Sequence, residues 1–204
     1  MTLDDLHPWV LPFVPDCPSQ TVNHHLLQAA IEFCSRTLVW KERLDTVLAD
    51  GFSTRYTLAL DDQIDIAKIY TVQVGLDEAT VVESLDGAQR VRDGTSVRLA
   101  WTDNRRDINV HPVPADAEEI SVVAALKPAR TAFSLPDVVF VHHMDDVANG
   151  ALARLLSMPK QTWSDLNLAQ MAGARFQDAI TSAARHASGG FARRTPRCKS
   201  TRFF

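Results

Sequence analysis

The chain has 204 residues, of which 46% are hydrophobic and 23% charged; this is ordinary globular usage and excludes wholesale disorder. No run of 18 apolar residues occurs, so the sequence predicts no membrane-spanning helix. The first residues, MTLDDLHPWV, lack the basic region of a signal peptide. Three widely spaced cysteines, Cys17, Cys34 and Cys198, argue against a disulfide framework or a zinc site. We therefore expect a protein of a reducing compartment.

The charge is unevenly distributed along the chain. There are 21 basic and 25 acidic residues, but six basic residues and no acidic one lie between Arg185 and Phe204. The body therefore carries a formal charge of −10 and the C-terminal stretch +6. A basic arm on an acidic body indicates an anionic partner, either nucleic acid or the acidic surface of another protein. The alternative is a solvated, disordered chain end.

The N-terminal half divides into a proline-rich segment and a helix. Residues 1–20 contain four prolines, which block a long helix, so we expect an extended or turn-rich segment docked on the body through its apolar residues. Residues 21–53 are assigned to a helical bundle, with Ser19 or Thr21 as the cap of its first helix and Gly51 near its end. An apolar stripe at spacings of three and four predicts that helix: Val22, Leu26, Leu27, Ala30, Ile31, Cys34 and Leu38.

Residues 54–129 form the predicted β insertion. The hydrophobic period changes to two here, and the Asp86-Gly87 and Asp93-Gly94 dipeptides mark turns. Residues 96–101 and 107–113 flank a polar bend and predict a hairpin. The pattern indicates five to seven short antiparallel strands, arranged as a sheet or a sandwich.

Two further helices are predicted in residues 130–188. Asp137 can cap the first, whose stripe continues to Met158, and Thr162 or Ser164 begins the second, which ends at Gly189. Gly150 weakens the first of these helices but permits close packing. The fold class is therefore α+β: a small helical bundle of one N-terminal and two C-terminal helices, an inserted antiparallel sheet or sandwich, and an extended basic arm, residues 189–204.

Only one cluster has the residue types of a metal site. His142, His143, Asp145 and Asp146 could supply imidazole and carboxylate ligands to a zinc- or iron-type ion, but no further ligand set points to them, and a polar helical surface is the simpler interpretation. Cys34 lies on an apolar stripe, which favours a structural thiol over a nucleophile. No phosphate-binding loop or nucleophile elbow occurs. We expect no catalytic site, metal or cofactor.

The arm and three aromatic residues are the candidate contact sites. Trp40, Trp163 and Phe176 are predicted packing or interface anchors. The arm could clamp a phosphate backbone, stack on single strands or dock on a protein, and its final phenylalanine pair favours the protein. Its predicted contact residues are Arg193, Arg194, Arg197, Lys199, Arg202, Phe203 and Phe204.

Several short motifs follow one another along the chain: EFCSRTLVWKE (32–42), the Tyr-Thr-Leu strand (56–58), INVHPVP (108–114), AALKPAR (124–130) and the helical pair GALARLLSMPKQTWSDLNLAQMAGARFQDAI (150–180). In these motifs and their order, the chain resembles the head-to-tail adaptor (connector) proteins of tailed bacteriophages. The resemblance covers the chain from about residue 21 to its end. Each motif is moderately specific, and their common order and spacing carry the resemblance.

The resemblance implies a structural role in the virion. Proteins of this type form a ring, usually twelve-fold, under the portal of the capsid, where the ring extends the DNA channel and docks the tail or nozzle proteins. The implied location is the neck between capsid and tail, after assembly in the host cytoplasm, with DNA passing through without sequence-specific binding and without a membrane. The implied role of the arm is contact with the portal or a neighbouring subunit. The alternatives are a nucleic-acid-binding accessory protein that uses the basic arm and a metal-dependent enzyme that uses the His142–Asp146 cluster.

Overall fold

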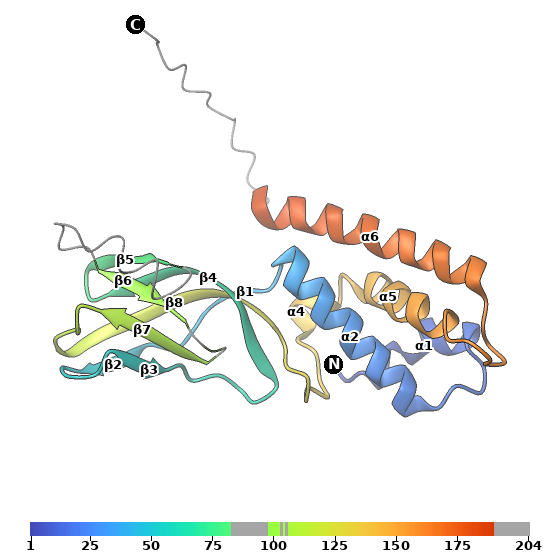
Figure 1. The fold of residues 1–204 in the computed structure, drawn as a ribbon, viewed down its shortest axis with the longest axis horizontal. Helices are drawn as coiled ribbons and strands as arrows, with labels where there is room; N and C mark the ends of the chain where they lie inside the picture. Colours follow the sequence, from blue (N-terminus) through green and yellow to red (C-terminus); the bar gives the residue numbers. More distant parts are fainter. Residues whose placement is uncertain (83–97, 103, 105, 190–204) are drawn as a thin grey trace, which may run out of the picture.

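The computed structural model describes residues 1–82, 98–102, 104 and 106–189. The helices lie at one end of an elongated molecule and the strands form a curled sheet at the other end (Figure 1). The fold is α+β, which confirms the predicted class. The elements are η1 (Asp4–Leu6), α1 (His7–Val10), η2 (Leu11–Phe13), α2 (Ser19–Thr37), β1 (Lys41–Arg43), β2 (Val47–Asp50), β3 (Arg55–Thr57), β4 (Ile64–Val74), β5 (Asp77–Val81), β6 (Leu99–Trp101), β7 (Asp107–His111), β8 (Asp116–Pro128), α4 (Asp137–Phe140), α5 (Met144–Leu156) and α6 (Leu166–Gly189).

Helix α2 lies at the centre of the helical part, against α5 and α6. Most of its apolar stripe is buried, as its spacing predicts, whereas Ile31 and the C-cap residue Leu38 are partly buried. It begins directly after Pro18, and no side chain caps it, so the predicted Ser19 or Thr21 cap is wrong. It ends because Leu38 adopts a left-handed conformation with φ of 53°, while its amide still donates to the Cys34 carbonyl at 3.0 Å.

The N-terminal segment docks on the helices as a series of short helical turns. Leu6, Val10 and Val14 are fully buried, and α1 contacts α5. Prolines at the start of α1 and η2 suit these short elements, because the first turn of a helix leaves the amide that proline lacks unpaired. The prediction of a turn-rich, docked segment is confirmed.

The sheet has the strand order β1-β8-β4-β5-β6-β7-β3, and β2 also pairs with β8. Strand β8 is its longest strand, and Ile120, Val122, Ala124 and Leu126 alternate toward the core. Strands β6 and β7 form the predicted antiparallel hairpin. Strands β5 and β6 pair in parallel, so the prediction of a purely antiparallel arrangement is wrong for this pair.

Three predicted features differ from the structure. Strands β1 and β2 lie within residues 41–50, in a range assigned to the helical bundle, because both pair with β8. The single helix predicted after Asp137 is two helices, α4 and α5, separated by a turn in which His143 has φ of −129°. Helix α6 begins at Leu166 rather than at Thr162 or Ser164, and the Asp165 carboxylate accepts from the Leu168 amide at 3.0 Å.

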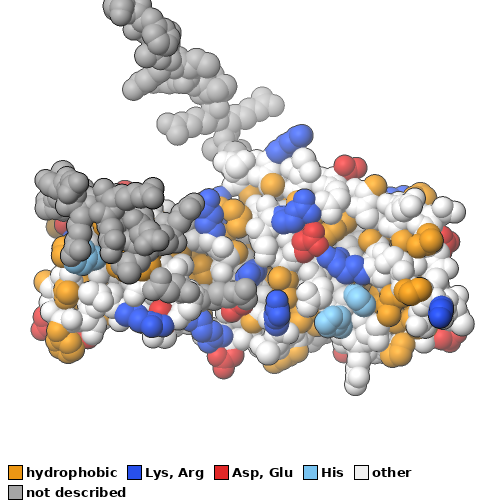
Figure 2. Space-filling view, in the orientation of Figure 1, with side chains coloured by type: hydrophobic (Ala, Val, Ile, Leu, Met, Phe, Trp, Pro, Cys, Tyr) orange, Lys and Arg blue, Asp and Glu red, His pale blue; other side chains and the backbone are white. Residues whose placement is uncertain are grey.

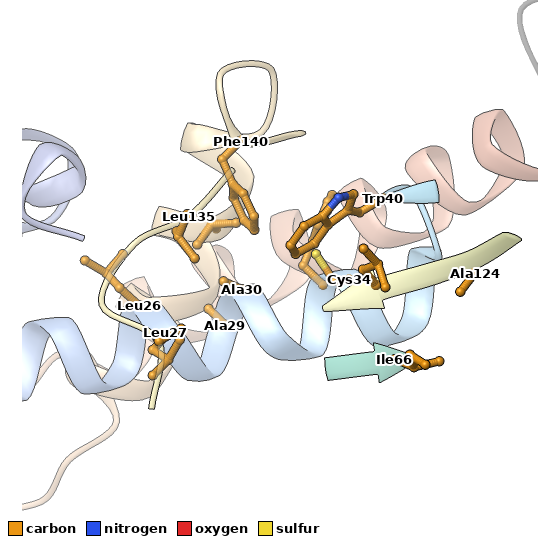
Figure 3. Close-up of a cluster of buried hydrophobic side chains, with 14 of the residues drawn as sticks. Leu26, Leu27, Ala29, Ala30, Cys34, Trp40, Ile66, Ala124, Leu135 and Phe140 are labelled. Carbon is orange, nitrogen blue, oxygen red and sulfur yellow. The ribbon is translucent and has the colours of Figure 1, made fainter. Parts of the chain in front are cut away.

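One hydrophobic core joins the helices to the sheet. Figure 3 shows part of the junction: the Trp40 ring lies beside Cys34 of α2, near Ile66 of β4 and Ala124 of β8. The Trp40 carbonyl accepts from the Leu126 amide of β8 at 2.8 Å, and its indole Nε1 donates to Glu42 at 3.2 Å. Trp40 therefore ties the end of α2 to the longest strand of the sheet.

Candidate interaction surfaces

The predicted contact residues of the arm, Arg193, Arg194, Arg197, Lys199, Arg202, Phe203 and Phe204, lie outside the described residues. The structure does describe the helix that precedes them. Helix α6 lies along α2 and α5, and its last turns extend toward the sheet (Figure 1). There the Lys41 ammonium of β1 donates to the Ala187 carbonyl at 2.6 Å. A cation at this position suits the partial negative charge of a helix C-terminus.

Two of the predicted aromatic anchors lie in the core of the chain. Trp40 is 7% exposed and Phe176 is 3% exposed. The Phe176 ring lies 6.4 Å from the Phe33 ring and 5.7 Å from the Arg154 guanidinium. These two side chains are placed for packing within the chain, and sequence spacing alone did not separate that role from an interface.

Trp163 lies in the connection between α5 and α6 and is half-buried. Its indole Nε1 is buried and has no hydrogen-bond partner in the described part of the chain. An unpaired donor of this kind is costly unless another group reaches it. Of the three predicted anchors, Trp163 is therefore the one whose hydrogen-bond donor is left without a partner in the described part of the chain.

The His142–Asp146 cluster does not converge on one point. The His143 imidazole Nδ1 lies 2.9 Å from the Asp146 carboxylate, and its ring packs on Phe33 with centroids 4.8 Å apart. His142 and Asp145 are exposed. Among the described residues, no group of three or more His, Cys, Asp or Glu side chains is placed to hold a metal ion.

Cys34 is fully buried, and desolvation raises the pKa of its thiol to about 12. A thiolate is the nucleophilic form of cysteine, and burial of this kind suppresses it at neutral pH. Cys34 and Cys17 are both free and buried. The thiol of Cys34 contributes packing, as its place on the apolar stripe indicates.

A groove that sequence reasoning did not identify lies between the N-terminal segment, α5 and α6. Its volume is about 390 Å³. Trp9, Phe13 and Met171 line it and remain 38%, 49% and 55% exposed. Its polar lining includes Asp145, Asn149 and Arg175. Exposed apolar surface of this kind on three elements is typical of a protein contact surface.

The surface in Figure 2 shows how the charges are distributed on one face. Lys and Arg side chains gather in the middle of this face, where the helical part meets the sheet. Two arginines of the helical part are tied to the fold, because Arg36 and Arg154 both contact the Glu32 carboxylate. In the described part of the chain, none of the helices is both long and apolar enough to cross a membrane.

Comparison with known proteins assigns the chain to a family. The family model described as SU10 adaptor protein matches residues 1–197, which is nearly the whole chain. A search of curated proteins gives no match. The match includes the helical part, the sheet and the arm as far as residue 197. The chain belongs to the SU10 adaptor protein family, a phage family of the head-tail adaptor type.

Proposed function

We propose that this protein is a structural component of the virion neck, a head-to-tail adaptor that forms a ring under the portal. In this role the ring extends the DNA channel, and its outer end docks tail or nozzle proteins. The family match over residues 1–197 is the observation that carries the proposal. The proposal includes no catalytic activity, no cofactor and no sequence-specific contact with the DNA that passes through.

The shape of the chain is compatible with a ring subunit. Two distinct parts share one core, so the chain presents different surfaces at its two ends. A closed ring needs such differences, because each subunit uses one surface toward the preceding copy and another toward the next. The apolar groove at the helical end supplies one surface that a partner could cover.

The basic arm completes the proposal as the contact with the portal or a neighbouring subunit. It carries cations and phenylalanines without an acid, from Arg193 to Phe204. The body of the chain carries the opposite charge, so a neighbouring copy offers a complementary surface. A segment of this composition orders on a partner by burying its rings and pairing its cations.

The mass of the purified protein, measured by light scattering alone and with the cognate portal, tests the proposal. We expect a 22.6 kDa monomer to enter a ring-sized complex when the portal is added. A variant with Arg193→Glu, Arg194→Glu and Arg197→Glu should assemble poorly, whereas Lys160→Glu, on the surface of the α5–α6 connection, should assemble normally.

Nucleic-acid binding is the competing function, and the same samples test it. A DNA-binding accessory protein would ignore the portal and bind duplex DNA with an affinity that falls linearly with the logarithm of salt concentration. That result would overturn the adaptor proposal. If the arm variant assembles normally, the arm is not a contact needed for assembly, but the proposal that the protein forms a ring still stands.

A further inference from the structure

A group of exposed cations lies around one tyrosine on the outer face of the sheet. The Lys41 and Lys68 ammonium groups lie 4.8 Å and 5.7 Å from the centre of the Tyr70 ring. Arg43 follows Lys41 at the next position on the same side of β1, because side chains alternate along a strand. All four side chains are exposed. We call Lys41, Arg43, Lys68 and Tyr70 the basic face.

Carboxylates and a fully exposed leucine occupy the far end of the same sheet. Strand β4 begins opposite Pro128 and ends opposite Ile120, so its hairpin with β5 lies at the end of the sheet away from the helices (Figure 1). Leu76, in that hairpin, is completely exposed. Asp77, Glu78 and Glu119 are exposed around it. We call Leu76, Asp77, Glu78 and Glu119 the acidic tip.

In the described part of the chain, the Arg98 cation beside the acidic tip pairs with Asp77 and Glu118 and leaves the carboxylates of Glu78 and Glu119 to face outward. The Arg98 guanidinium lies 2.8 Å from Glu118 and 3.5 Å from Asp77, and its side chain is only 22% exposed. No ion pair to Glu78 or Glu119 occurs among the described residues. The acidic tip and the basic face are complementary: each has one apolar or aromatic side chain at its centre, and the charges beside the two centres are opposite.

The two surfaces cannot meet within one chain. Lys68 and Leu76 are separated by eight residues, of which most belong to one extended strand, so they lie on the order of 25 Å apart. We propose that the basic face of one copy receives the acidic tip of the next copy. The contact is heterologous, because each copy contributes a different surface, and heterologous contacts form a ring when the rotation between successive copies closes.

This inference rests on the proposed function, since it names the surfaces by which neighbouring subunits of the ring meet. Leu76 packs against the Tyr70 ring, and Glu78 and Glu119 lie opposite Lys68 and Arg43. The positive charge of Lys41 also fixes the end of α6 through the Ala187 carbonyl. Contact at the basic face therefore occurs next to the root of the arm.

Charge reversal tests the inference in the full chain, with light scattering in the presence of the portal as the measurement. Lys68→Glu and Glu78→Lys each place like charges opposite each other and should weaken assembly at least about tenfold. The double variant should assemble like the wild type, because each interface again joins opposite charges. A mixture of the two single variants should assemble too, as alternating copies. Lys160→Glu and Asp178→Lys, both exposed and outside the two surfaces, are the matched controls.

Each result has a defined reading. Normal assembly of both single variants overturns the inference and leaves the adaptor function intact, whereas failure of the wild type to assemble overturns both. Glu78→Lys could assemble weakly while Lys68→Glu assembles normally. That result would show that the acidic tip contacts a segment other than the basic face, and it would also overturn the inference. Loss of duplex DNA binding by Lys68→Glu without loss of assembly assigns the basic face to nucleic acid instead.

Discussion

Gly150 of α5 lies directly against the ring of Phe176 of α6. A Cβ atom at residue 150 would lie 2.8 to 2.9 Å from three carbons of that ring, closer than carbon atoms approach in folded proteins. The ring is 3% exposed and packs near Phe33 and Arg154, so it has little room to move. The glycine therefore sets how closely α5 and α6 approach, which confirms the role that its position in the helix predicts.

Replacing Gly150 with alanine should destabilise the protein despite the better helix propensity of alanine. The propensity gain is about 1 kcal/mol, whereas overpacking of a filled core costs about 1 to 3 kcal/mol. Gly173→Ala is the matched control, because its Cβ would meet Ala153 at an ordinary 3.7 Å and should stabilise α6. Chemical denaturation of both variants checks the pair; equal stabilisation by both substitutions would contradict the close approach.

Glu32 links three helices, and its neutralisation should loosen that link. Its carboxylate contacts the Arg154 guanidinium of α5 and lies 3.0 Å from that of Arg36, which also donates to Gln177 of α6 at 2.7 Å. Because the groups are partly exposed, Glu32→Gln should cost about 1 kcal/mol of unfolding free energy, and less in high salt. Asp62→Asn is the control: its partner is Arg106, and its side chain is 96% exposed, so the change should be smaller. Equal losses for both variants would argue against the three-helix link.

Sequence periodicity predicted the helices and strands in which buried residues recur at a regular spacing. The stripes of α2, α5 and α6 and the alternation in β8 are properties of single segments, so they are visible without the rest of the fold. Strand β1 carries no such signal, because all three of its residues are exposed and only pairing with β8 defines it. The break between α4 and α5 depends in the same way on tertiary contacts rather than on local pattern.

The candidate surfaces were harder to predict than the fold. The groove combines Trp9, Leu152 and Met171 from three elements, and no spacing in the sequence brings these residues together. The basic face likewise joins β1 to β4 across β8, and it becomes visible only once the sheet order is known. The charge asymmetry of the arm was readable from composition, because it lies in one continuous segment.

Cys34 should be unreactive in the folded protein. At pH 8 a thiol with a pKa of about 12 is ionised in about one molecule in 10,000, and its burial also blocks the reagent. In the Cys17→Ala, Cys198→Ala variant, we expect thiol modification at least about a thousandfold slower than that of a free cysteine, and rapid modification in denaturant. Fast modification of the native variant would show that the junction beneath Trp40 opens readily.

Asp50 should titrate far below an ordinary aspartate. The Ser53 hydroxyl, the Ser53 and Phe52 amides and the Tyr56 hydroxyl all donate to its carboxylate and lower its pKa from 3.8 to about 2. Because the folded-state pKa is the lower one, the stabilisation is complete above about pH 5 and is lost as the pH falls toward 2. Carboxyl NMR titration measures this directly.

Ser53→Ala separates the contribution of the hydroxyl from that of the amides. It removes the largest single cause of the shift, so the Asp50 pKa should rise toward 3.8 while the backbone amides still hold it below that value. Asp50→Asn should remove the acid-dependent part of the stability of the β2–β3 turn and leave the turn itself in place. An Asp50 pKa unchanged by Ser53→Ala would mean that the amides alone organise this turn, and the hydroxyl would then serve only to anchor Ser53.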